Sequence, residues 1–128
     1  MKELRRYAYT LLERFGIDAA EVSVTFVDDD IIRDLNRKYR GNDRETDVLA
    51  FELSEPEDDM LLGDIYISMD RVKDQARANN VRMKEETLRL LIHGVLHLCG
   101  YGDDEKSGRE EMFKMQENLV KGFLEGGR

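Results

Sequence analysis

The chain contains two histidines, His93 and His97, which are four residues apart. Residues i and i+4 of an α-helix lie on the same face, so both imidazoles can reach one metal ion. Gly100 follows where a left-handed residue can end a helix, and a chain that turns back there brings Asp103 toward the same ion. Two imidazoles and a carboxylate leave one tetrahedral position for water, which is typical of catalytic zinc. Other divalent metals also accept these donors.

The spacing alone leaves a second interpretation open. Histidine pairs at i and i+4 also occur on surface helices that bind no metal. In that interpretation, the histidines are ordinary surface residues and an acidic loop follows their helix. Asp104 is also a candidate for the third ligand, although the spacing from Gly100 favours Asp103.

The same stretch partly matches H-E-x-x-H, the helix motif of zinc peptidases, whose glutamate is the general base. Gly94 occupies the glutamate position. Because glycine cannot take a proton from water, peptide hydrolysis is the weaker alternative. Zinc lowers the pKa of its bound water to about 7, so hydrolysis at phosphorus does not require that glutamate.

Basic side chains are concentrated in two segments. Residues 31–44 hold five basic and two acidic side chains, and residues 70–89 hold six and four. They form an RNA-facing surface if they fold beside the histidine helix, or else they are solvated helix faces. Arg40 is the candidate for phosphate binding, because a guanidinium binds phosphate oxygens with a planar fork. A helix-end cation on local carbonyls is the alternative, and Arg37 and Arg44 are further candidates for RNA contact.

Hydrophobic periodicity predicts the elements that position these residues. The expected helices cover residues 2–15, the stretch from the N-cap aspartates 28–30 to near Gly41, 70–80, 84–99 and 105–124, and the expected strands cover 22–27, 47–53 and 62–68. The sequence therefore predicts one α+β domain over residues 1–128, with a small mixed sheet of three to four strands and about five helices. The order of the strands cannot be read from the sequence.

Composition excludes several classes of protein. The formal net charge of −8 argues against indiscriminate nucleic-acid binding. Cys99 is the single cysteine, so no internal disulfide points to an oxidising compartment and the cytoplasm is expected. No stretch reaches the roughly 18 apolar residues of a membrane span. We expect neither a membrane partner nor DNA.

The stretch His93–Tyr101 reads H-G-x-L-H-L-x-G-Y, and it resembles the signature of the YbeY family of bacterial rRNA maturation factors. Residues 24–51 are similar to the strand-helix-strand block of that family, and residues 61–65 to its next block. The resemblance implies a metal-dependent, single-strand-specific endoribonuclease that acts in 16S rRNA 3′-end maturation and ribosome quality control. It implies one zinc ion per chain on three side chains, a functional arginine at Arg40, and the 30S subunit and assembly factors as partners.

Two departures from the family pattern have consequences. The family usually has a histidine as third zinc ligand, and Asp103 stands at its position. A carboxylate is an acceptable zinc ligand, although loss of the histidine leaves room for a ribosome-assembly binding factor with weak or no activity. Family members also commonly begin with a strand before the first helix, whereas this chain opens in helix, so the sheet is expected to lack one strand.

Overall fold

The computed structural model describes residues 2–55, 57–101 and 106–126. Along this part of the chain the elements are α1 (Lys2–Arg14), β1 (Ala20–Val27), α2 (Asp29–Arg40), β2 (Val48–Glu52), β3 (Leu61–Ser68), α3 (Met69–Asn79), α4 (Met83–Leu98) and α5 (Lys106–Gly126). The α+β class, the five helices and the small mixed sheet are confirmed. No helix in the described ranges is both long and apolar enough to cross a membrane.

The sheet has the strand order β1-β3-β2. β1 pairs in parallel with β3, from Ala20 opposite Leu61 to Val27 opposite Ser68. β2 pairs with β3 in the antiparallel sense, with Val48 opposite Ile67. The central strand is thus the last one in the sequence, an arrangement that periodicity along the chain does not encode.

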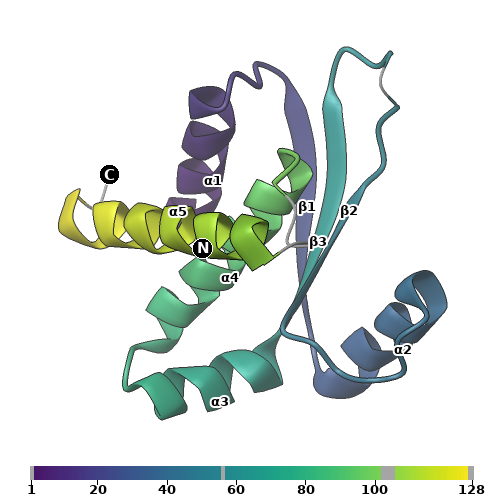
Figure 1. The fold of residues 1–128 in the computed structure, drawn as a ribbon, viewed down its shortest axis with the longest axis vertical. Helices are drawn as coiled ribbons and strands as arrows, with labels where there is room; N and C mark the ends of the chain where they lie inside the picture. The colour runs from purple at the N-terminus through teal and green to yellow at the C-terminus, as the bar shows by residue number, and fades with distance from the viewer. Residues whose placement is uncertain (1, 56, 102–105, 127–128) are drawn as a thin grey trace.

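α4 is the central helix of the molecule. It packs against β2 and β3 and is contacted by α1, α3 and α5, and Figure 1 shows α1, α4 and α5 on one side of the sheet and α2 on the other. Two glycines permit the close approach of α4 to β3. A Cβ added at Gly94 would lie 2.9 Å from Ile65 Cγ2, and one added at Gly63 would lie 2.8 Å from Leu98 Cδ1.

The ends of α2 are set by local capping. The Asp28 carboxylate accepts a hydrogen bond from the Ile31 N–H, and Gly41 terminates the helix in the left-handed conformation at φ 74°. These caps are the ones that the sequence predicts. Arg40 is therefore the last residue of α2, at the point where the chain turns toward β2.

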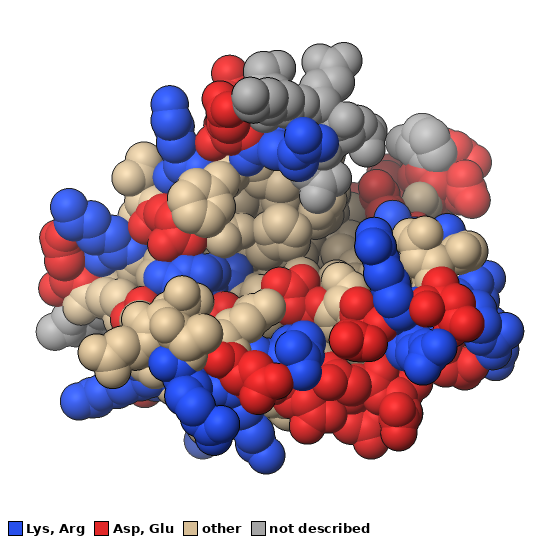
Figure 2. All heavy atoms as spheres, turned by 60° about the horizontal axis from the view of Figure 1, so that its bottom comes forward, with Lys and Arg blue, Asp and Glu red and all other residues tan. Residues whose placement is uncertain are grey.

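Acidic and basic side chains are interspersed on the surface. Figure 2 shows this on the face where α2 and α3 come forward. The ion pairs of these helices are Arg33–Asp43, Arg37–Asp34, Lys38–Asp34, Arg71–Asp29 and Arg71–Asp74. Three of the five basic side chains of residues 31–44 are thus paired with the two carboxylates of the same segment, which favours solvated faces for those three side chains.

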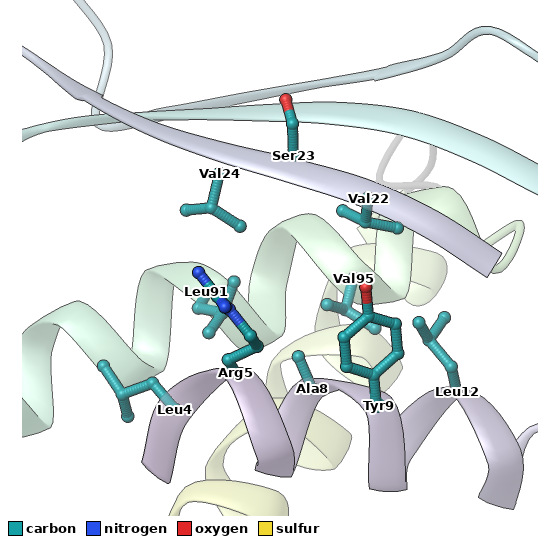
Figure 3. Close-up of a pocket in the computed structure, with 10 residues that line it drawn as sticks. All are labelled: Leu4, Arg5, Ala8, Tyr9, Leu12, Val22, Ser23, Val24, Leu91 and Val95. Atoms are coloured by element: carbon teal, nitrogen blue, oxygen red, sulfur yellow. The ribbon is translucent and has the colours of Figure 1, made fainter. Parts of the chain in front are cut away.

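β1 is an edge strand of the sheet. A hollow of about 350 Å³ lies between this strand, α1 and α4. Figure 3 shows Val22 and Val24 pointing into it from β1, with Ala8 and Tyr9 on α1, while Ser23 points to the opposite face of the sheet. The described residues contain three strands, in agreement with the lower of the two strand numbers expected.

Candidate active site

The two histidines lie half-buried on one face of α4 with their Nε2 atoms directed at each other. These atoms are 3.2 Å apart, and the ring planes are inclined at 74°. Two nitrogen ligands at about 2.0–2.1 Å from a tetrahedral zinc ion are roughly 3.3 Å apart. His93 and His97 therefore have the separation of two ligands of one ion, and the donor set fits the metal that the sequence predicts.

Gln116 of α5 orients the imidazole of His93. Its Oε1 lies 2.7 Å from His93 Nδ1, and the Gln116 side chain is buried with 6% exposure. An amide oxygen can only accept a hydrogen bond, so this contact places the proton on Nδ1 and leaves the Nε2 lone pair for a ligand. Sequence reasoning missed Gln116. The sequence feature that could have identified it is a polar residue on the apolar face of a helix, with Met112 at i−4 and Val120 at i+4.

An ion-pair network holds α5 against α4 beside the histidines. Arg89 Nε donates to Glu117 at 2.8 Å, and Gln116 Nε2 donates to the same carboxylate at 3.2 Å. Arg89 also pairs with Glu85 and Glu86 of its own helix. Burial lowers the pKa of Arg89, but the hydrogen bonds that it donates to these carboxylates outweigh burial and raise the pKa. The arginine is thus a permanent cation that holds Glu117, and Gln116 donates to that carboxylate.

The histidines open into a polar cavity of about 330 Å³. Besides His93 and His97, its lining includes Arg40, Arg44, Asn36, Asn42, Thr46 and Asp47. The cavity therefore joins the end of α2, the loop after it and β2 to the C-terminal half of α4. Of the three arginines predicted to contact RNA, Arg40 and Arg44 line this cavity, whereas Arg37 lies outside its lining in an ion pair with Asp34.

Arg40 is held by β2 rather than by the end of its own helix. Its Nη2 donates to the Ala50 carbonyl at 2.8 Å, and its guanidinium lies 5.1 Å from the centre of the Phe51 ring. Among the described residues, neither Arg40 nor Arg44 has a carboxylate partner. A positioned guanidinium with further donors in a cavity can bind an oxyanion.

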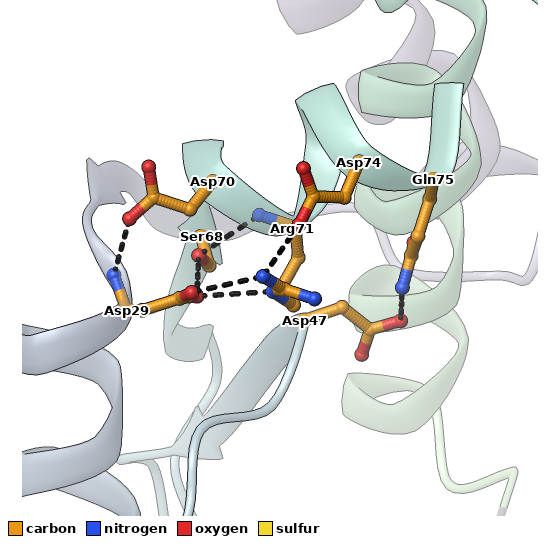
Figure 4. A network of polar contacts seen from close by, with 7 residues as sticks. All are labelled: Asp29, Asp47, Ser68, Asp70, Arg71, Asp74 and Gln75. Carbon is orange, nitrogen blue, oxygen red and sulfur yellow. Dashed lines mark hydrogen bonds and ion pairs between the residues drawn. The ribbon is translucent and has the colours of Figure 1, made fainter. Parts of the chain in front are cut away.

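A polar network surrounds the start of α2, and among the described residues a single carboxylate, that of Asp47, lies in the cavity wall. Figure 4 shows Arg71 bridging Asp29 and Asp74, with Ser68 donating to Asp29. In the same view Gln75 Nε2 donates to Asp47 at 3.3 Å. Sequence reasoning also missed Asp47 as a cavity residue, because it assigned Asp47 to the predicted strand 47–53 and gave it no chemical role. These contacts tie α2 and the start of β2 to α3.

Comparison with known proteins identifies the family. The family model described as Endoribonuclease YbeY matches residues 1–124. The chain belongs to the YbeY family. An Endoribonuclease YbeY of Persephonella marina is 43% identical over 114 residues, covering 85% of this chain and 74% of that protein. The Bacillus subtilis protein of the same name is 41% identical over 134 residues, covering 96% and 85%.

A solved structure supports the fold of this YbeY family member. The solution structure of TM1509 from Thermotoga maritima matches with a TM-score of 0.62 and 37% identity, over 94% of this chain and 80% of that one. The agreement confirms the predicted α+β architecture, in which the histidine helix lies in the C-terminal half of the chain.

The third ligand expected in YbeY proteins falls in a part of the chain left undescribed. Asp103 and its competitor Asp104 both lie outside the described residues. Within the described ranges, no group of three His, Cys, Asp or Glu side chains comes together as a metal site. Gly94, which occupies the position of the peptidase glutamate, faces the core against Ile65. A side chain at this position would therefore point into the core and not toward a substrate.

Proposed function

We propose that this protein is an endoribonuclease that cleaves single-stranded RNA. A zinc ion is held by His93, His97 and Asp103, and Arg40 binds the scissile phosphate. The observation that carries the proposal is the single cavity lined by both histidines together with Arg40 and Arg44. Membership in the YbeY family, whose relatives are named endoribonucleases, supports RNA as the substrate.

The donor set supports zinc on chemical grounds. The two Nε2 atoms are spaced as ligands of one ion, and Gln116 holds the tautomer of His93 that leaves its Nε2 lone pair available. When bound, the ion supplies an acidified water near neutral pH and polarises a phosphoryl oxygen. The carboxylate of Asp103 completes three protein ligands, and other divalent ions compete at such a mixed nitrogen and oxygen site.

Arg40 supplies the complementary charge. When an oxygen nucleophile attacks phosphorus and the leaving oxygen departs, negative charge accumulates on the nonbridging oxygens. The guanidinium is held on Ala50 and Phe51, so it does not have to be immobilised when the strand binds. Arg44 lies in the same cavity and can neutralise a neighbouring phosphate. The Asp47 carboxylate, fixed by Gln75, restrains indiscriminate anion binding there.

The proposal extends to a role in the cell. We propose that the substrate is the 3′ end of 16S rRNA on the 30S subunit. The protein then acts in rRNA maturation and ribosome quality control in the cytoplasm, together with assembly factors. This step rests on the family resemblance and on the acidic total charge, which disfavours unselective RNA binding. Incubation with 30S subunits that carry precursor 16S rRNA tests it, since the precursor end must be trimmed by the wild type and not by His97→Ala.

A substrate panel tests the activity itself. Single-stranded RNA, fully paired RNA and casein are incubated with the zinc-replete wild type and with His97→Ala. We expect cleavage of the single strand alone, lost in the variant and lost after chelation. Casein cleavage that depends on His97, with RNA untouched, would instead identify a zincin-like peptidase.

One observation favours a second candidate, a ribosome-assembly binding factor with weak catalysis. Asp103 stands where the family has its third histidine. Metal analysis after zinc-replete purification separates the two functions, because an enzyme of this kind retains about one ion per chain. Less than about a tenth of an equivalent, with RNA binding intact, would favour the binding factor.

A further inference from the structure

A second cavity lies beside the polar histidine cavity and shares part of its wall. This neighbouring cavity measures about 300 Å³, and Asp47 and His93 line both. Its further lining includes the apolar side chains of Leu90, Met112 and Phe113. Ligand pockets generally measure about 300–1,000 Å³, so the space is large enough for a small planar group. A chain bound at the histidines therefore has an apolar recess directly beside it.

Phe113 is the exposed wall of this recess. Its side chain is 60% exposed, whereas its neighbour Met112 and the nearby Gln116 on α5 are buried. The ring also lines a third hollow, of about 430 Å³, together with Arg109 and Lys114. Phe113 thus stands between two hollows and contributes little to the core.

A second exposed aromatic side chain provides a comparison. Tyr39, next to Arg40, is 67% exposed and packs edge-on against Phe51 with ring centres 5.5 Å apart. Phe113 has no such contact with another ring among the residues described here. Since single-strand binders stack bases on exposed aromatic rings beside basic side chains, a strand across the histidines would meet Arg40 on one side and Phe113 on the other.

We propose that the recess beside Phe113 is a nucleobase subsite. It takes an unpaired base of the RNA strand whose phosphate lies on Arg40, with the base stacked on Phe113 and its edge near Leu90 and Met112. The proposal rests on the proposed function, because continuity with the histidine cavity is what assigns the recess to RNA. It adds a reason for selecting single strands, since a paired base cannot leave its stack to enter without an energetic cost.

Fluorescence provides a direct test, because the chain contains no tryptophan. Phe113→Trp places the single tryptophan of the variant in the recess, where it is excited selectively over the five tyrosines, and Leu124→Trp, at a 51% exposed position on the same helix, is the control. A six-nucleotide single-stranded RNA is titrated into each variant in the presence of chelator, which prevents cleavage. We expect base stacking to quench the first variant and not the second, with no quenching by an abasic oligonucleotide.

Affinity provides the second measurement. Stacking is worth about 1–3 kcal/mol per base, so Phe113→Ala weakens binding of the hexamer about 5- to 150-fold, while Phe113→Tyr preserves it and Leu124→Ala leaves it unchanged. In cleavage assays Phe113→Ala raises KM for the hexamer far more than it lowers kcat. An unchanged affinity of Phe113→Ala for the hexamer would overturn the subsite, and the exposed ring would then be assigned to contact with a protein partner.

The two proposals fail in different ways. If wild type and Phe113→Ala bind and cleave the hexamer equally, with cleavage lost in His97→Ala, the base subsite is wrong and the endoribonuclease stands. If the wild type neither binds nor cleaves any single-stranded RNA, the proposed function itself fails and the subsite fails with it.

Discussion

The Oε1 atom of Gln116 lies 2.7 Å from Nδ1 of His93 and joins α5 to the histidine pair of α4. Gln116 is itself held by Glu117, which Arg89 binds in turn. The chain of contacts runs from a permanent cation to one imidazole nitrogen. It leaves the other nitrogen of that ring facing His97.

We expect Gln116→Met to weaken zinc binding about 10- to 100-fold, since loss of an outer hydrogen bond to a ligand has that effect. Competition with a chromophoric chelator measures the affinity. In the metal-free protein, ¹⁵N NMR of the imidazole reports the tautomer, and the variant shows the Nδ1-protonated form of His93 less populated. Gln116→Glu keeps an acceptor and restores that tautomer, and Asn118→Met controls for loss of an exposed amide on α5. An unchanged imidazole spectrum in Gln116→Met would argue against this role.

Gly94 is required by packing. An added Cβ meets Ile65 Cγ2 at 2.9 Å, and Ile65 is fully buried. Gly94→Ala therefore lowers the free energy of unfolding by about 1–2 kcal/mol despite the better helix propensity of alanine. Urea denaturation measures it. Gly122→Ala is the matched control, because nothing lies within 4 Å of its added Cβ, and it gains up to about 1 kcal/mol. Equal gains at both positions would contradict the close helix–strand contact.

Arg40 acts through its planar fork, so lysine does not replace it. Arg40→Ala and Arg40→Lys are both expected to lower kcat for single-stranded RNA by about 100-fold, the size of one lost transition-state donor. Single-turnover cleavage measures this step. Arg33→Lys is the control, since Arg33 pairs with Asp43 outside the cavity lining. Full activity of Arg40→Lys would reduce the role of Arg40 to that of a positive charge.

Asp103 lies outside the described residues, and its role as third ligand is a prediction from the sequence. We expect Asp103→Ala to weaken zinc binding about 10-fold or more and Asp103→His to preserve or strengthen it. Asp104→Ala is the control, expected to bind zinc as the wild type does. If all three variants bind zinc as tightly as the wild type, another residue must be the third ligand.

Asp29 makes stability depend on pH. Burial raises the pKa of this carboxyl, but hydrogen bonds from Arg71 and Ser68 outweigh burial and lower it. A lowered folded-state pKa adds stability that is complete above the unfolded pKa of about 4 and is lost as the pH falls through the folded value. Asp29→Asn is therefore less stable than the wild type at pH 7, and the difference shrinks toward pH 2. Urea midpoints measured from pH 7 to pH 2 test this.

The exposed neighbour Asp30 provides the control for that series. At pH 7, Asp30→Asn is expected to lower the urea midpoint less than Asp29→Asn does, because no hydrogen bond or ion pair of the Asp30 side chain is present in the described structure. A difference for Asp29→Asn that grows toward low pH would reverse the assigned direction of the pKa.

The sequence by itself determined the local features of this protein. Helix limits follow from periodicity and caps such as Asp28 and Gly41, and the shared face of His93 and His97 follows from the 3.6-residue period, because both depend on neighbours within a few residues. The HGxLHLxGY stretch further identified the family, and the comparisons confirm it.

Only the tertiary structure decided which distant side chains meet. The strand order β1-β3-β2 and the packing of α4 on β3 through Gly63 and Gly94 bring Arg40 to the histidine cavity. The packing of α5 against α4 places Gln116 beside His93, although the two residues are more than 20 positions apart in the chain. Such contacts arise from how faces of separate elements fit together, and no spacing along the chain records that fit.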